Sequence, residues 1–66
     1  MTLDDARDAL GRPGVPRVLY RPAPMTGPPE VGVIRFVSDR FVFVRYAGDR
    51  HSKATDPADL ELLAAE

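Results

Sequence analysis

The sequence contains no cysteine among its 66 residues. This absence excludes disulfide bonds, thiolate metal ligands, a cysteine nucleophile and thiol redox chemistry. Short domains bury a smaller fraction of their surface than long ones, so many of them rely on disulfides or a bound metal to support a small core. We therefore expect a single domain over residues 1–66 that is stabilised by packing, or by packing together with self-association.

Long apolar runs are absent as well. No stretch approaches the roughly 20 apolar residues that span a bilayer. Residues 1–10 lack the basic and apolar regions of an export signal. We expect a cytoplasmic protein that has no membrane partner.

The residue types that build metal sites and catalytic centres are sparse. His51 is the single histidine, and the carboxylates follow no recognised spacing of metal ligands. Asp49, His51 and Ser52 include the residue types of a hydrolytic triad, but triad side chains converge from separate segments, whereas neighbours in one turn diverge. The sequence therefore predicts no catalytic residue, no metal site and no cofactor.

Charge is distributed unevenly along the chain, although the formal net charge is −1. Residues 17–53 contain seven basic and three acidic residues, whereas residues 54–66 contain four acidic residues and no basic one. A basic segment is typical of proteins that bind phosphate or nucleic acid. Scattered arginines on strands are also common as a solvated face, so the charge alone leaves both interpretations open.

The N-terminal pattern predicts a short helix over residues 2–10. Thr2 and Asp5 have the spacing of a capping box, in which the side chain of each residue bonds to the backbone amide of the other. Gly11 supplies a stop signal. The apolar residues that recur at helical spacing are Leu3, Ala6 and Leu10. A helix this short is unstable alone, so we expect its apolar stripe to dock on the rest of the protein.

Residues 30–46 predict a β-hairpin. Two runs rich in β-branched and aromatic residues flank a polar turn at 38–40. Alternation along the second run places one set on the core face, namely Val42, Val44 and Tyr46. The set on the opposite face is Phe41, Phe43 and Arg45. Both faces of this hairpin are therefore partly apolar.

The first run of the hairpin does not alternate regularly. Gly32 and Ile34 share the face that we assign to the core. Val37 joins them on that face only if the strand contains a bulge near Arg35 or Phe36. We therefore predict a bulge at one of these two positions.

Shorter patterns complete the predicted set of elements. Residues 16–21 predict a first strand, and residues 22–29 form a proline-rich connection that is stiffened by the fixed φ angle of proline. A short strand begins at 54–55. A single helical turn with a capping aspartate covers 56–59, and a final strand covers 60–63.

This order of elements resembles that of SH3-like barrels over residues 16–64. The segment 56–63, Asp-Pro-Ala-Asp-Leu-Glu-Leu-Leu, is similar to the single helical turn and last strand of Tudor-type and KOW-type members. The resemblance implies a mainly β fold, a small five-stranded SH3-like barrel with an added N-terminal helix. It does not imply one function, because small barrels bind peptides, nucleic acid, ribosomes or one another.

Five segments also resemble small uncharacterised proteins of actinobacterial phages and prophages. These segments are 32–34, 42–46, 48–49, 52–55 and 57–60. The resemblance implies a phage accessory protein that acts in the host cytoplasm or in the virion, with no assigned chemistry.

The best candidate interaction surface is the second apolar face of the hairpin. Phe36, Phe41 and Phe43 are more aromatic side chains than a 66-residue core easily buries, and Arg35 and Arg45 lie on or next to the same face. Aromatic residues and arginine are enriched where interfaces carry binding energy. Either the apolar stripe of the N-terminal helix covers this face, or a protein partner or a second copy of the chain does.

A second candidate site is an anion site at the end of the hairpin. Arg45, Arg50, Ser52 and Lys53 would converge on a phosphate there. The simpler interpretation is that Arg45 pairs with a carboxylate such as Glu61 while the others are solvated. We therefore expect a non-enzymatic interaction module that binds a protein partner or itself, with nucleic-acid or nucleotide binding as the alternative.

Overall fold

The computed structural model describes residues 1–21 and 28–63, so most of the predicted proline-rich connection lies outside the described part. The elements in chain order are α1 (Leu3–Gly11), β1 (Arg17–Tyr20), β2 (Glu30–Val37), β3 (Val42–Tyr46), β4 (Lys53–Thr55), the 3₁₀ turn η1 (Pro57–Asp59) and β5 (Leu60–Leu62). Each predicted element that falls within the described residues is present, with its bounds within one residue of those expected.

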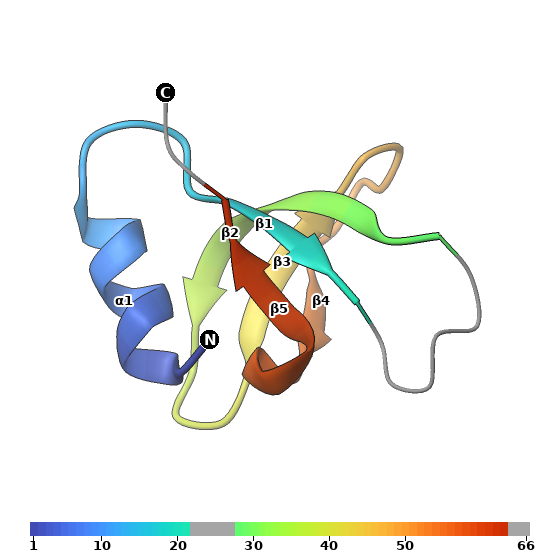
Figure 1. The fold of residues 1–66 in the computed structure, drawn as a ribbon. Coiled ribbons are helices and arrows are strands. Elements are labelled where there is room, and N and C mark those ends of the chain that lie inside the picture. Colours follow the sequence, from blue (N-terminus) through green and yellow to red (C-terminus); the bar gives the residue numbers. More distant parts are fainter. Residues whose placement is uncertain (22–27, 64–66) are drawn as a thin grey trace.

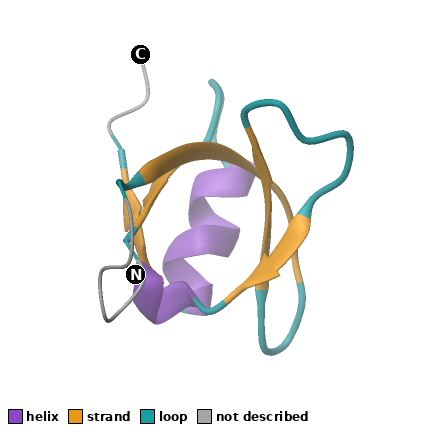
Figure 2. Ribbon diagram, turned by 90° about the vertical axis from the view of Figure 1, so that its right-hand side faces the viewer, coloured by secondary structure: helices purple, strands orange, loops and turns teal. Residues whose placement is uncertain are grey.

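The strands form one antiparallel sheet in the order β4-β3-β2-β1-β5. The sheet curls into a half-barrel, and Figure 2 looks along its interior. The connection between β1 and β2 is long, yet it joins neighbouring strands, while β5 returns to the far side of β1 (Figure 1). The mainly β fold that the sequence predicts is confirmed.

Helix α1 covers one open end of the half-barrel (Figures 1 and 2). Its start is fixed by the predicted capping box: the Thr2 hydroxyl accepts a hydrogen bond from the Asp5 amide at 3.1 Å, and the Asp5 carboxylate accepts one from the Thr2 amide at 3.0 Å. The buried face of α1 consists of Ala6 and Ala9. The prediction that Leu10 belongs to this face is wrong, because this residue is 41% exposed.

The hairpin of β2 and β3 forms the centre of the sheet and contains the predicted bulge. Its register is regular up to the pair Ile34 and Val44, shifts there, and resumes at the pair Phe36 and Phe43. Arg35 is therefore the extra residue, and the shift returns Val37 to the side of the core.

Gly32 allows β2 and β3 to pack closely at the start of the hairpin. A Cβ atom at this position would collide with the Val44 side chain and would lie 3.1 Å from the carbonyl oxygen of Arg45. A residue without a side chain is therefore required here.

The core lies between α1 and the concave face of the sheet. Its buried apolar residues are Ala6, Ala9, Val18, Ile34, Val42, Val44, Tyr46 and Leu60. The hydroxyl groups of Tyr46 and Thr55 lie 3.0 Å apart inside it, so this polar pair is buried with its hydrogen bond made. Burial raises the pKa of Tyr46, against the opposing effect of this hydrogen bond.

The 3₁₀ turn η1 connects β4 to β5. The Asp56 carboxylate accepts a hydrogen bond from the Ala58 amide at 2.9 Å, and Pro57 begins the turn. This turn leads into β5, where Leu60 is buried against the core and pairs with Tyr20 of β1. Across residues 1–21 and 28–63, no helix is long and apolar enough to cross a membrane.

Candidate functional site

Two phenylalanine rings contact each other in a tilted arrangement on the outer face of the hairpin. Phe36 and Phe43 occupy opposite positions on β2 and β3, and their ring centroids lie 5.7 Å apart with an interplanar angle of 55°. Phe36 is 58% exposed and Phe43 is half-buried. Phe41, which is 43% exposed, lies at the end of the adjoining turn. We call these three residues the aromatic patch.

Local chemistry fixes the turn beside the aromatic patch. The Ser38 hydroxyl accepts hydrogen bonds from the amides of Arg40 and Phe41, at 3.2 and 2.9 Å. The Ser38 amide donates to the Phe41 carbonyl at 2.9 Å. The exposed Phe41 therefore lies on a backbone that these hydrogen bonds hold in place.

Helix α1 does not cover the aromatic patch. Its buried residues pack inside the end of the barrel, and its contact with the hairpin turn is made by Arg7, which donates to the Ser38 carbonyl at 3.0 Å. Of the two possibilities that the sequence leaves open, cover by the stripe of α1 is contradicted by the exposure of Phe36.

Three arginines lie beside the aromatic patch on the same outer face. Arg17 of β1 pairs in register with Val33 of β2, and Val33 pairs with Arg45 of β3, so the two arginines flank one valine. Arg35 follows on β2, and all three arginines are exposed. They line a groove of about 500 Å³, to which Val31 also contributes. We call Arg17, Arg35 and Arg45 the arginine groove.

The arginines of this groove make no ion pair with any carboxylate in the described residues. The ion pairs within 1–21 and 28–63 involve other basic residues, namely Arg7, Arg12, Arg21 and Lys53. Arg45 uses its Nε atom to donate to the Asp49 carbonyl at 3.1 Å. The expected pair between Arg45 and Glu61 is wrong, because Glu61 lies on β5 and contacts Arg21 at 3.6 Å.

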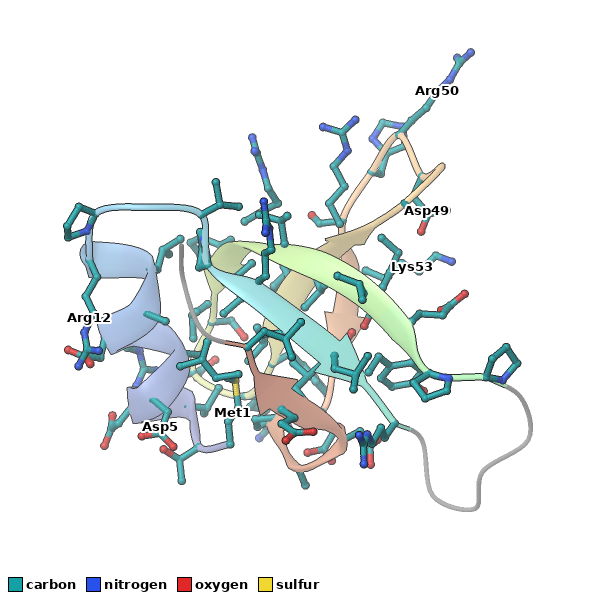
Figure 3. All side chains as sticks on the ribbon, turned by 45° about the horizontal axis from the view of Figure 1, so that its top comes forward. Met1, Asp5, Arg12, Asp49, Arg50 and Lys53 are labelled. Carbon is teal, nitrogen blue, oxygen red and sulfur yellow. The ribbon has the colours of Figure 1, made fainter. Side chains whose placement is uncertain are left out.

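The structure separates the members of the second predicted site. Lys53 pairs with Asp49 at 3.4 Å and lines a cavity beside the tyrosines, whereas Arg45 lines the groove on the outer face. Arg50 projects away from the barrel at the tip of the turn between β3 and β4 (Figure 3). Ser52 is exposed in the same turn.

Sequence reasoning missed Arg17. Its relevance depends on the register between β1 and β2, which follows a long connection and which the sequence does not determine. A signal was present, because alternation along 17–20 places Arg17 and Leu19 on the face opposite the buried Val18.

Asp49, His51 and Ser52, the residues considered for catalysis, all lie in the turn between β3 and β4. His51 and Ser52 are exposed, and the carboxylate of Asp49 is engaged by Lys53. Within the described residues, no group of three or more histidine or carboxylate side chains is placed to hold a metal ion.

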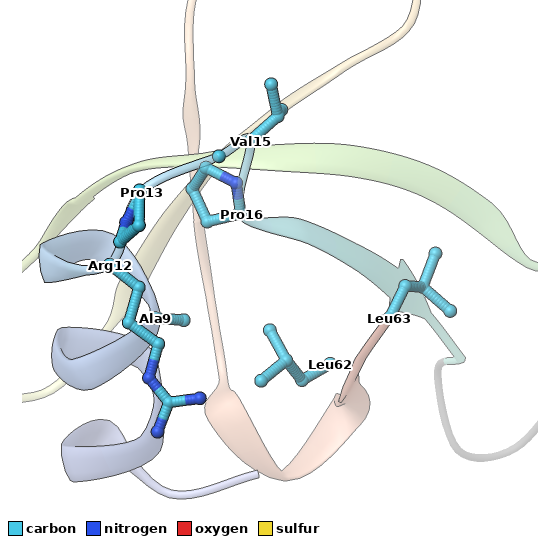
Figure 4. Close-up of a pocket in the computed structure, with 8 residues that line it drawn as sticks. Ala9, Arg12, Pro13, Val15, Pro16, Leu62 and Leu63 are labelled. Atoms are coloured by element: carbon cyan, nitrogen blue, oxygen red, sulfur yellow. The ribbon is translucent and has the colours of Figure 1, made fainter. Parts of the chain in front are cut away.

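A further cavity of about 350 Å³ lies between α1 and β5, and Figure 4 shows the residues that line it. Its walls are mostly apolar and include Ala9, Pro16 and Leu62. Its one charged residue, Arg12, is paired with Asp8. The cavity therefore lacks the convergent polar groups that orient a ligand.

Comparison of the chain with protein-family models, with curated protein sequences and with solved structures finds no match.

Proposed function

We propose that this chain is a non-enzymatic interaction module that binds another molecule through the outer face of the hairpin formed by β2 and β3. The observation that carries the proposal is the 58% exposure of Phe36 on an ordered strand, beside a second ring that it contacts. An exposed aromatic cluster of this kind marks an interaction site more often than a solvated surface.

The charge around the aromatic patch favours a partner other than a second copy of the chain. A symmetric dimer uses the same face twice. It would therefore bring the arginine groove of one copy toward that of the other, and within the described residues none of these arginines is already paired with a carboxylate of its own chain. Like charges across an interface oppose association. The face suits a partner that carries negative charges beside flat or apolar groups.

The resemblance to small phage proteins supports a biological setting for this module. We propose that it is an accessory protein of a phage or prophage, acting in the host cytoplasm or in the virion. Its partner then belongs to the phage or to its host.

The test is a titration of ¹⁵N-labelled protein with two anionic probes, an oligothymidylate and a peptide of alternating aspartate and phenylalanine. We expect at least one probe to shift amide resonances of Val33, Phe36 and Arg45. The matched control is the same peptide with asparagine in place of aspartate, which should shift them less. Shifts confined to the cavity between α1 and β5, or none with either probe, would contradict the proposal.

The oligomeric mass of the free protein provides an independent check. We expect a monomer by sedimentation at the concentration used for the titration. A stable dimer that Phe36→Ser converts to monomer would show that a second copy occupies the face.

A further inference from the structure

We infer that the partner is a single-stranded nucleic acid, with phosphates in the arginine groove and a base stacked on Phe36. This inference rests on the proposed function, because it assigns a ligand class to the same outer face. Such a ligand requires cationic side chains for its phosphates and an aromatic ring next to them for a base.

The bulge at Arg35 provides that arrangement. In a regular strand, consecutive side chains point to opposite faces, so an exposed arginine is followed by a residue that faces the core. Here the register shift leaves both Arg35 and Phe36 exposed. Their Cα atoms are consecutive and therefore about 3.8 Å apart. A cationic side chain and an aromatic side chain are thus both exposed at consecutive positions, as a nucleotide carries a phosphate beside a base.

The groove extends the cationic surface across three strands. Arg17 and Arg45 flank Val33 from the two neighbouring strands, which places their Cα atoms about 10 Å apart at the usual strand spacing. Their side chains line one groove together with Arg35. Three neighbouring guanidiniums repel one another unless an anion lies between them, and a guanidinium fork matches the oxygens of a phosphate.

Arg45 is partly oriented before any ligand binds. Its Nε atom donates to the Asp49 carbonyl at 3.1 Å, which holds the guanidinium and leaves its terminal amino groups for a ligand. A side chain that is already held loses less conformational entropy on binding.

The exposed ring distinguishes a single strand from the other anionic partners. A duplex presents phosphates but keeps its bases stacked inside, so it has no free base for Phe36. A single strand has unstacked bases that pair well with aromatic side chains. The carboxylates of an acidic peptide can pair with the arginines, but they make no use of the ring that lies beside Arg35.

The experiment measures binding of the whole chain to fluorescent oligothymidylate of about ten nucleotides, within the range that one small barrel covers. Three phosphate contacts predict a slope of about −2 for log K against log salt concentration. Arg17→Gln and Arg45→Gln should each reduce that slope by about 0.7. Arg50→Gln is the matched control, because Arg50 projects from the tip of its turn (Figure 3), and it should leave the slope unchanged.

The ring is tested by a second pair of variants. Phe36→Leu keeps an apolar side chain but removes the π-face, and we expect it to weaken binding about fivefold or more with the salt slope unchanged. Phe36→Tyr keeps the ring and should bind as the unsubstituted chain does. Because Phe36 is exposed, circular dichroism should show that both variants fold.

Each other outcome overturns a specific statement. Equal affinity for a duplex of the same length, or an equal effect of Arg50→Gln, overturns the inference. Binding of the acidic peptide at Phe36 without binding of oligothymidylate overturns the inference but leaves the proposed function standing. Absence of binding by both probes overturns the inference and the proposed function together.

Discussion

The phenolic oxygen of Tyr46 lies 3.0 Å from the hydroxyl oxygen of Thr55, in a buried contact that joins β3 to β4. Thr55 in turn donates to the Lys53 carbonyl at 3.3 Å, so Tyr46 is the donor of the pair. The hydroxyl groups of Tyr46 and Thr55 therefore form a short series of hydrogen bonds that ends at the carbonyl of Lys53, on the edge strand β4.

We expect Thr55→Val to destabilise the protein more than Tyr46→Phe does. The first change leaves the Tyr46 hydroxyl buried without its acceptor, which costs about 1–3 kcal/mol, whereas the second removes a donor from a group that keeps another partner and costs about 1 kcal/mol. Urea unfolding of both single variants and the double variant measures this. Costs that simply add in the double variant would contradict the direct hydrogen bond.

Alkaline pH should reveal the burial of Tyr46. Burial raises the pKa of Tyr46 above its ordinary value, so the folded state holds the proton more tightly than the unfolded state. The associated stability is complete below about pH 10 and is lost as the pH rises through the folded pKa. The urea midpoint should therefore fall more steeply above pH 10 in the unsubstituted chain than in Tyr46→Phe. If the urea midpoints of the two chains fell in parallel above pH 10, the raised pKa of Tyr46 would be contradicted.

Gly32→Ala should lower the free energy of unfolding by about 1–3 kcal/mol, because a methyl group there collides with Val44 and the strand backbone has to move. Gly11→Ala is the matched control. Apart from its chain neighbours and the backbone of its own helix, no atom lies within 4 Å of a Cβ placed at Gly11, which is the last residue of α1. The control should therefore be neutral or slightly stabilising in thermal melts. Equal melting temperatures of the two variants would be inconsistent with the close approach at Gly32.

The capping box of α1 should make part of the free energy of unfolding depend on pH in the acidic range. Hydrogen bonds from the amide and the hydroxyl of Thr2 hold the pKa of Asp5 below its ordinary value. A carboxylate of this kind stabilises the fold at neutral pH and loses that contribution as the pH falls through its folded pKa, below about pH 4. The difference in stability between the unsubstituted chain and Asp5→Asn should therefore shrink between pH 7 and pH 2. A constant difference would show that Asp5 does not act through its charge.

Features that depend on local chemistry could be predicted from the sequence. The box of Thr2 and Asp5, the turn capped by Asp56 and the bulge at Arg35 each follow from residue types within a few positions of one another. In each case the alternation or the capping pattern allows few other arrangements. The central hairpin, and with it the aromatic patch, could therefore be predicted from the sequence.

Features that depend on distant pairing were not accessible. Leu10 and Ala9 both lie near the apolar stripe of α1, and the way in which the helix docks selects Ala9. Arg45 and Glu61 were expected to pair, but the sheet order places β2 and β1 between their strands. Arg17 joins the arginine groove through the register of β1 with β2, which no local pattern determines.

The extra residue in β2 also governs how this chain has to be aligned with any relative. A homologous hairpin with a regular ladder lacks one residue at the position of Arg35, so a correct alignment contains a one-residue gap there. An alignment without that gap sets Phe36 against a core position and Val37 against a surface position. Every inside and outside assignment on one side of the bulge is then reversed, and the similarity of the two hairpins is hidden.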